Sequence, residues 1–253
     1  MSKYAAYTMI GLARILGGMS LLAFIIFLLV GSLNLLDMHL DESGVLWLDA
    51  GLSLLFFIQH SGMIRKPFHR WLARFIPEEY AGAIYAIASG IVLLLLILLW
   101  QTSTQTIMTP SGIFRWSLRA VSFFSLLGFY WGVKALRFFD PFGLRPIFNR
   151  LRGRNPTSMP FTVAGPYRWV RHPLYLFMIL MIWACPDLTA DRLLFNLLWT
   201  VWIVIGSYFE ESDLIVEFGD AYREYQKRVP MLVPLSKWPK RERIIVNKGH
   251  DRD

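Results

Sequence analysis

Long apolar runs separated by short polar segments occupy most of the sequence. A helix that crosses a bilayer core needs about 20 predominantly apolar residues. Six runs approach this requirement, at residues 15–36, 45–64, 81–100, 116–139, 173–186 and 193–209. The fifth run is short for a full crossing, and only the segment PDLTAD separates it from the sixth. The pattern therefore predicts six transmembrane helices, the last two as a tight hairpin.

The apolar spacing changes after the sixth run. Apolar side chains then recur at intervals of four, four, three and four residues, at Leu214, Phe218, Tyr222, Tyr225 and Val229. This spacing is typical of one face of an α-helix that packs on an apolar surface. Together with the six runs, it predicts an all-α polytopic membrane protein with a C-terminal amphipathic helix.

The composition agrees with a chain that is solvated mainly by lipid. Among the 253 residues, 55% are hydrophobic and 17% are charged, whereas a soluble domain carries about a quarter charged residues. The segments between the apolar runs are too short to build a separate core. We expect a single membrane domain over 1–253, with four spans in 1–139, a core in 140–234 and a basic tail in 235–253. The single cysteine, Cys185, excludes a multi-cysteine metal cluster, and no metal site is predicted.

The net charge of +8 is distributed unevenly among the loops. Basic residues gather in 65–74, 145–171 and 223–252, while DMHLDESG and PDLTAD are acidic and QTSTQTIMTPSG is uncharged. Six spans place all the basic loops on one side, which is the cytosolic side by the positive-inside rule. We therefore predict two cytosolic termini. A bacterial or archaeal inner membrane is the default location that we assume. Membrane orientation accounts for the charge without a nucleic-acid partner, and the basic tail at 237–252 would lie on anionic lipid.

Ionisable residues gather at the cytosolic ends of the predicted spans. A transporter would place such groups near the bilayer midplane, often in repeated halves. Neither feature is found in this sequence. The pattern instead favours a pocket that opens to the cytosol and is lined by some of His60, Lys134, Arg137, Arg171, His172, Glu210 and Glu211.

The first candidate cluster is GPYRWVRHPLY at 165–175. Pro173 suits the first position of a helix, where its missing N–H has no cost. Arg171 and His172 would then stand at a helix N-terminus, which together with an arginine can bind a carboxylate. The alternative is that Arg171 anchors the span while Tyr167 and Trp169 belong to an aromatic belt.

Two further clusters lie at the ends of spans. Glu210 and Glu211 follow the sixth apolar run, where unpaired charge is expensive, so Arg171 or a bound cation should neutralise them. The alternative is a plain Arg–Glu tie between the fifth and sixth spans. His60, within the second run, is a functional candidate because ionisable groups in membranes are rare. An ordinary interhelical hydrogen bond is its alternative, and FDPFGLRP at 139–146 is expected to be a membrane-exit loop.

The order of these motifs resembles a known family. A G-x-Y-x-x-x-R-H-P-x-Y stretch precedes a hairpin that ends in Glu-Glu, and F-G-x-x-Y-x-x-Y-x-x-x-V-P follows. Over 155–234 this resembles the isoprenylcysteine carboxyl methyltransferase superfamily. The stretches QHSGMIRKPFHRWLARFIP, FDPFGLRPIFNRLRGR and RVPMLVPL extend the resemblance to the branch of bacterial methanethiol S-methyltransferases and NnrU-like proteins.

The resemblance implies a SAM-dependent methyltransferase, where SAM is S-adenosylmethionine. The core at 140–234 would hold SAM at the cytosolic face, and a lipophilic acceptor would enter from the membrane. Position by position, the resemblance implies that the cofactor site comprises Phe161, Thr162, Tyr167, His172, Leu174, Tyr175 and Glu210. Glu210 would offset the positive charge of SAM, and Arg171 would orient its carboxylate.

The acceptor is predicted from a departure within the motif. Carboxyl-methylating relatives carry an arginine one helical turn before the glutamate, where this chain has Gly206. A small neutral thiol such as methanethiol therefore fits better than a carboxylate, although Tyr175 departs from the RHPLM pattern of thiol-methylating relatives. We predict His60, Arg171 and Glu211 as catalytic, with His60 as the base. The alternatives are a prenylcysteine, quinone or lipid acceptor, or a non-catalytic membrane factor.

Overall fold

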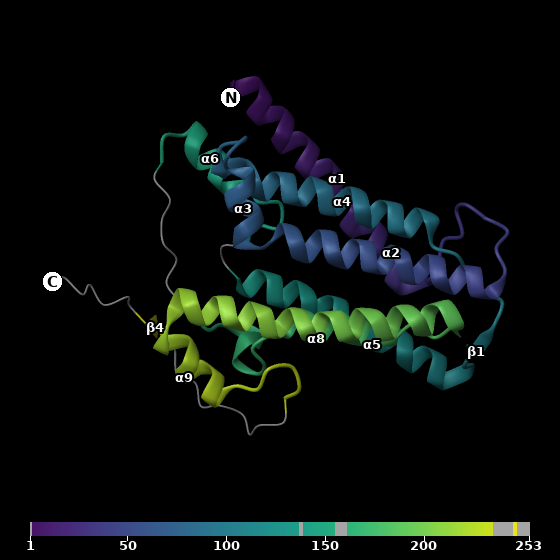
Figure 1. The fold of residues 1–253 in the computed structure, drawn as a ribbon. Coiled ribbons are helices and arrows are strands. Elements are labelled where there is room, and N and C mark those ends of the chain that lie inside the picture. The colour runs from purple at the N-terminus through teal and green to yellow at the C-terminus, as the bar shows by residue number, and fades with distance from the viewer. Residues whose placement is uncertain (1, 137–138, 155–160, 235–244, 247–253) are drawn as a thin grey trace. The chain divides into compact units, whose positions relative to one another are not determined.

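The protein is mostly helical. A computed structural model describes residues 2–136, 139–154, 161–234 and 245–246. In this part of the chain, four helical segments are long and apolar enough to cross a membrane: α1 (Lys3–Val30), α2 (Glu42–Met63), Glu78–Leu99, which contains α4 (Ala81–Leu99), and α8 (Ala190–Phe218) (Figure 1). A shorter apolar helix, α7, covers Pro173–Trp183. The chain is therefore an integral membrane protein built mainly from α-helices.

The remaining elements are short or more polar. The helical ones are α3 (Lys66–Leu72), η1 (Glu78–Tyr80), α5 (Gly112–Ala135), α6 (Arg145–Leu151), η2 (Gly165–Arg168) and α9 (Asp220–Arg228). Two small antiparallel pairs join β1 (Thr106–Met108) to β3 (Leu188–Thr189), and β2 (Phe161–Thr162) to β4 (Ile245–Val246). The contacts divide the chain into two compact units: Met1–Trp116, Asp140–Pro156 and Cys185–Trp199 form the first, and Ser117–Phe139, Thr157–Ala184 and Thr200–Asp253 the second.

The first helix differs most from its predicted bounds. It was expected at 15–36, but α1 begins at Lys3, where the Ser2 hydroxyl accepts a hydrogen bond from the Ala5 N–H. It ends at Val30, because Gly31 has a φ of 98°. Arg14 lies within α1 as an exposed side chain, 5.5 Å from the centre of the Phe148 ring. A long side chain at the helix surface is compatible with the helix, so hydropathy alone placed its start too late.

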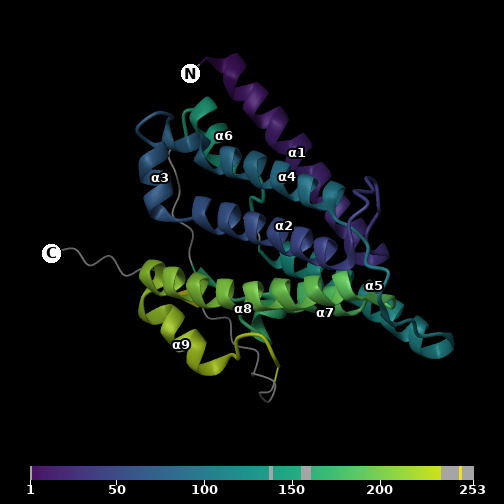
Figure 2. The same cartoon turned by 45° about the vertical axis from the view of Figure 1, so that its right-hand side comes forward.

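Small residues bring α1 and α4 together in the first unit. Ala13 and Gly17 are buried on α1, and Ala83 and Gly90 are buried on α4. A Cβ added at Gly90 would lie 3.0 Å from the backbone oxygen of Leu16. Close backbone approach through small residues is a common way to pack helices in membranes, where apolar side chains gain little by leaving lipid. Figures 1 and 2 both show the two helices side by side.

The FDPFGLRP segment packs onto this helix pair and is more than an exit loop. The Asp140 carboxylate accepts hydrogen bonds from the N–H groups of Leu144 (3.0 Å) and Arg145 (2.7 Å), which begin α6. Gly143 has a φ of 61°, and a Cβ there would lie 2.4 Å from the backbone of Gly82. The segment is therefore a loop that packs tightly against α4 and leads directly into α6.

Buried carboxylates organise another part of the first unit. Asp49 is fully buried on α2, and its Oδ1 accepts a hydrogen bond from the Gln101 N–H (3.1 Å). Asp191, near the start of α8, accepts hydrogen bonds from the Trp100 indole and the Ser103 N–H, both at 3.0 Å. Backbone groups after the end of α4 are thus satisfied by acids from α2 and α8. These contacts fix how the three helices meet.

In the second unit, α7 runs antiparallel to the later part of α8. At one end the Trp183 indole donates a hydrogen bond to the Thr200 hydroxyl (3.0 Å). At the other end His172 contacts Glu211. Helix α5 also packs on α7, because a Cβ on Gly128 would lie 2.4 Å from the Phe177 ring. Glycine on α5 thus allows α7 to pack closely, and Arg171 and His172, which directly precede α7, lie beside the glutamates of α8.

Candidate active site

The candidate site begins where the chain enters α7. Pro173 lies at the first position of the helix, with His172 before it as the N-cap. The Arg171 N–H donates to the carbonyl of Pro230 (2.9 Å), and the His172 N–H donates to that of Met231 (3.1 Å). The backbone of these two residues is therefore held by a segment from much later in the chain.

Arg171 is held by several acceptors at once. Its Nε lies 2.6 Å from Oε1 of Glu211, and its Nη2 lies 3.0 Å from Oε2. Its Nη1 donates to the carbonyl oxygens of Gln226 (3.0 Å) and Val229. A guanidinium has five N–H donors. These contacts use four of them, so Arg171 is largely committed to the protein itself.

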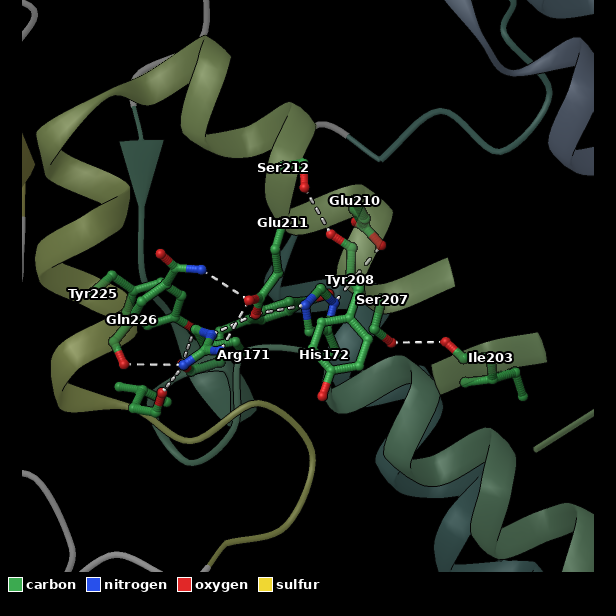
Figure 3. A network of polar contacts seen from close by, with 12 residues as sticks. Arg171, His172, Ile203, Ser207, Tyr208, Glu210, Glu211, Ser212, Tyr225 and Gln226 are labelled. Carbon is green, nitrogen blue, oxygen red and sulfur yellow. Dashed lines mark hydrogen bonds and ion pairs between the residues drawn. The ribbon is translucent and has the colours of Figure 1, made fainter. Parts of the chain in front are cut away.

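Glu211 is the centre of the polar cluster (Figure 3). In addition to Arg171, its carboxylate accepts a hydrogen bond from the Gln226 amide (2.8 Å) and lies 3.1 Å from Nε2 of His172. The Arg171 and Glu211 side chains are only 11% and 9% exposed. The positive charge of Arg171 thus compensates a carboxylate that would otherwise be buried alone. The structure thus contains an Arg171–Glu211 salt bridge, which was the structural alternative to a functional role for these residues.

His172 lies between two carboxylates. Its Nε2 faces Glu211, and its Nδ1 lies 3.7 Å from Oε2 of Glu210. The imidazole stacks on the ring of Tyr175, with centroids 5.4 Å apart and planes inclined by 13°. The His172 side chain is 4% exposed, whereas that of Glu210 is 46% exposed. The two glutamates therefore differ: the Glu211 side chain is enclosed by the protein, and the Glu210 side chain is about half-exposed.

A reversal of the chain brings the last helix to this cluster. Helix α8 ends at Phe218, Gly219 has a φ of 59°, and α9 begins at Asp220. Tyr222 and Tyr225 on α9 then pack with Val163 and Val229, and the Tyr225 hydroxyl donates to the Tyr167 carbonyl. The predicted apolar spacing identified residues that do share one hydrophobic cluster, but two helices joined at Gly219 present them. Glycine is suited to this left-handed backbone position.

Burial keeps the tyrosines near the cluster neutral. It raises the pKa of Tyr222 and Tyr225 above the ordinary value for tyrosine. It also raises the pKa of Tyr167, and the negative charge of Glu210 raises it further. An anionic phenolate is disfavoured both in apolar surroundings and beside a carboxylate. The negative charge of the site is therefore carried by the two glutamates.

The other residues predicted to bind a cofactor take different positions in the second unit. Phe161 packs against the rings of Phe218, Tyr222 and Tyr225 and so supports α9. Thr162, beside it in β2, is exposed. A Cβ on Gly132 would lie 2.6 Å from the Leu174 side chain, so Leu174 packs toward α5. These contacts do not test a role in cofactor binding, which stays a prediction.

His60 lies in the first unit and has its own partners there. Its Nε2 is 2.7 Å from the Tyr85 hydroxyl, and its ring lies 5.0 Å from that of Phe56. The structure thus contains the interhelical hydrogen bond that was the alternative to a catalytic role, and the catalytic role stays a prediction. Arg137 and residues 155–160 and 237–244, which also entered the sequence-based predictions, lie outside the described residues.

Sequence reasoning missed Gln226. Its amide donates to Glu211, and its carbonyl accepts from Arg171. The residue occupies an unspecified position in the F-G-x-x-Y-x-x-Y-x-x-x-V-P pattern, between Tyr225 and Val229. The available signal was its spacing: Gln226 follows the buried Tyr222 by four residues, so the two side chains lie on the same face of α9.

The fold and the site define a helical integral membrane protein with a clustered arginine, histidine and glutamate pair. Methanethiol S-methyltransferase 2 of Bradyrhizobium diazoefficiens is 42% identical over 180 residues, which are 71% of this chain and 70% of the relative. Methanethiol S-methyltransferase of a Pseudomonas species is 39% identical over 201 residues, or 76% of each chain. The chain belongs to the methanethiol S-methyltransferase family. The resemblance predicted from the sequence is thereby confirmed.

A more distant relative extends beyond bacteria. Nurim of Mus musculus is 27% identical over 184 residues, which are 66% of each chain. No protein-family model matches the chain, and no solved structure matches it. The family assignment therefore rests on the curated relatives.

Proposed function

We propose that this protein is a SAM-dependent S-methyltransferase of a bacterial or archaeal inner membrane that converts methanethiol to dimethyl sulfide. The observation that carries the proposal is 42% identity over 71% of the chain to a relative named for this reaction. The six-span topology with two cytosolic termini belongs to the same proposal, with α5 and α7 as the crossings added to the four long apolar segments. The cluster around Glu211 would then face the cytosol, where SAM is available.

The charged groups of the cluster suit SAM. SAM combines a carboxylate and an ammonium with a sulfonium, and when bound it supplies an electrophilic methyl group on the positively charged sulfur. Glu210 offers a half-exposed carboxylate to positive charge. Arg171 and the N-terminal turn of α7 offer donors to negative charge, although the protein already uses four of the five N–H groups of Arg171.

Each residue then has a distinct task. Glu210 offsets the charge of the cofactor, and Arg171 chiefly holds Glu211 while keeping one N–H for the cofactor carboxylate. Tyr167 and Tyr175 would border the cofactor, as the resemblance implies, together with Phe161, Thr162 and Leu174. The resemblance also places His172 there, but its two ring nitrogens face Glu211 and Glu210, so we assign it no direct bond to SAM. Most of the rate enhancement in such a displacement comes from alignment of the reactants and exclusion of water.

The surroundings of Gly206 favour a neutral acceptor. No atom lies within 4 Å of a Cβ built at this position. Gly206 precedes Glu210 by one helical turn, so it lies on the same face of α8. An arginine that would pair with an acceptor carboxylate is therefore missing here. This supports a small thiol over a prenylcysteine carboxylate, and a quinone or lipid acceptor is the second candidate.

Two measurements on the detergent-purified protein test the proposal. Calorimetry measures SAM binding, and headspace analysis measures dimethyl sulfide when methanethiol is supplied. SAM binding with dimethyl sulfide production is the expected result. SAM binding without this product would redirect the search to larger acceptors, and a folded protein that fails to bind SAM would be a non-catalytic membrane factor.

A matched pair of variants localises the cofactor. Glu210→Gln should weaken SAM binding by about fivefold, because a lost charge–charge contact at a partly exposed site is worth roughly 1 kcal/mol. Glu217→Gln is the control, because this glutamate is exposed on the same helix about two turns later. Equal SAM affinity in the Glu210 variant and the wild type would remove Glu210 from the cofactor site.

A further inference from the structure

Each ring nitrogen of His172 faces a different carboxylate. Nε2 lies 3.1 Å from Oε1 of Glu211, which is hydrogen-bonding distance, and Nδ1 lies 3.7 Å from Oε2 of Glu210, which is too long for a hydrogen bond. Glu211 is fixed by Arg171 and Gln226. A neutral imidazole in this setting places its N–H on Nε2, directed at Glu211, and leaves the Nδ1 lone pair directed toward Glu210.

The charges of the cluster point to a role for that lone pair. With His172 neutral, the cluster contains Arg171 and two glutamates and so has one excess negative charge. Methylation of a neutral thiol by a sulfonium removes one positive charge from the cofactor and releases one proton. A proton captured within the cluster would keep the total charge of the site constant. This matters because unpaired charge is costly in a site shielded from water.

We propose that Nδ1 of His172 accepts the thiol proton during methyl transfer, an inference that rests on the proposed function. The S–H bond of the thiol breaks, its electron pair remains on the thiol sulfur, and the proton bonds to Nδ1. The thiol sulfur forms its new bond to the methyl carbon as the carbon–sulfonium bond breaks and leaves its pair on the departing sulfur. The imidazolium then lies between two carboxylates, and the half-exposed Glu210 borders the route by which the proton leaves.

The assignment distinguishes His172 from His60 and gives Glu211 a positioning role. His60 lies in the first unit against Tyr85 and Phe56, whereas His172 lies between two carboxylates that stabilise an imidazolium. Glu211 fixes the tautomer and orientation of His172. Arg171 and Gln226 act one step further away, because they hold Glu211 in place.

The test compares two small thiols in the variant His172→Gln. A glutamine amide can still donate to Glu211 but has no basic nitrogen. At saturating SAM, turnover of methanethiol should fall by about 100-fold or more, the usual contribution of a general base. Trifluoroethanethiol is a stronger acid than methanethiol and is partly ionised at mildly alkaline pH. Its methylation therefore depends less on a general base. Its turnover should fall by no more than about tenfold, and SAM binding by calorimetry should change less than about threefold.

The controls separate the inference from the function on which it depends. Wild-type protein that forms no dimethyl sulfide would contradict the proposed function itself. His39→Asn should match the wild type, because His39 is exposed and its φ of 52° is one that asparagine tolerates. Preferential loss of methanethiol turnover in His60→Ala, with His172→Gln fully active, would assign the proton to His60 instead.

Other results would also overturn the inference. Equal losses with both thiols, or a large loss of SAM binding, would make His172 a cofactor ligand or a structural residue. If His172→Gln fails to fold, Glu210→Gln provides the test, because Glu210 is half-exposed. At saturating SAM this variant should slow methanethiol more than trifluoroethanethiol, since it removes one of the two charges that stabilise the imidazolium. Equal slowing would contradict the proposal.

Discussion

The guanidinium of Arg171 and the carboxylate of Glu211 meet in two side-by-side hydrogen bonds, 2.6 Å from Nε to Oε1 and 3.0 Å from Nη2 to Oε2. The pair joins the start of α7 to the later part of α8, forty positions further along the chain. It also determines where His172 can lie, because the same Oε1 atom faces the imidazole. Stability and site geometry therefore depend on one contact.

Removal of one partner should destabilise the protein strongly. Arg171→Ala leaves the Glu211 carboxylate buried without its counter-ion, a change that typically costs about 3–5 kcal/mol. The double variant Arg171→Ala/Glu211→Ala should lose less than the sum of the two single variants, because no unpaired charge remains. Unfolding of all four proteins in detergent measures this coupling. Additive losses would mean that the pair contributes nothing as a pair.

Substitution at Gly143 should weaken the packing of the FDPFGLRP segment. Gly143 and Gly153 have nearly the same φ, 61° and 62°, but only a Cβ at Gly143 would collide with the backbone of Gly82. Gly153→Ala should cost about 1–2 kcal/mol for its left-handed backbone alone. Gly143→Ala should cost clearly more. Equal losses of unfolding free energy would show that the close approach to Gly82 is unimportant.

Gly206 should tolerate substitution, whereas Gly128 should not. A Cβ at Gly206 meets no atom within 4 Å, while one at Gly128 would lie 2.4 Å from Phe177. Gly206→Ala should stabilise α8 by about 0.5–1 kcal/mol through helix propensity, and Gly128→Ala should destabilise the protein. The same free space should accommodate Gly206→Arg.

Gly206→Arg should also shift acceptor preference toward carboxylates. The new guanidinium would lie one turn from Glu210 and could pair with an acceptor carboxylate, as arginine does bidentately. The measurement is methylation of a prenylcysteine analogue relative to methanethiol, with Gly206→Gln as the uncharged control. An unchanged preference in a folded Gly206→Arg protein would show that the acceptor does not approach this face of α8.

The packing of α9 should weaken at alkaline pH. Burial raises the pKa of Tyr225 above its ordinary value, so the folded protein holds the phenolic proton more tightly than the unfolded chain. This stabilisation is complete below the ordinary tyrosine pKa of about 10 and is lost as the pH rises beyond it. Unfolding measured between about pH 8 and 11 should show a shallower decline for Tyr225→Phe than for the wild type.

A surface tyrosine provides the control for this pH dependence. Tyr130 is 63% exposed, so Tyr130→Phe should decline with pH as the wild type does. Identical declines in Tyr225→Phe and the wild type would show that proton release from Tyr225 is not linked to unfolding. Tyrosinate absorbance, followed in parallel, reports whether ionisation and unfolding occur together.

The apolar runs predicted the positions of α2 and α4 within a few residues, because each helix is about as long as the hydrocarbon region is thick. The start of α1 was missed because a hydropathy argument stops at a charged residue, whereas Arg14 can extend from the helix surface toward Phe148. The break at Gly219 was also missed. Glycine commonly ends helices, but the apolar spacing continues through it and favoured one uninterrupted helix.

The candidate site could be predicted only in part. The sequence predicted an Arg171–Glu211 contact as one of two alternatives, because a buried acid needs a counter-ion and Arg171 lies at the start of the neighbouring span. It gave Glu210 and Glu211 different roles but could not show which of the two is buried, since adjacent residues on a helix point in different directions and only the packing decides which is enclosed. Gln226 reaches Glu211 across the turn at Gly219, a geometry that no spacing in the sequence encodes.

Residues 226–230, which complete the cluster around Arg171, are among the last described residues to be synthesised. Arg171 receives acceptors from Gln226, Val229 and Pro230, all of which follow α8 in the chain. All four long apolar segments can therefore enter the membrane while the cluster is still incomplete. A chain that stops before Gln226 would retain those segments but would lack the carbonyl groups that hold Arg171 beside Glu211.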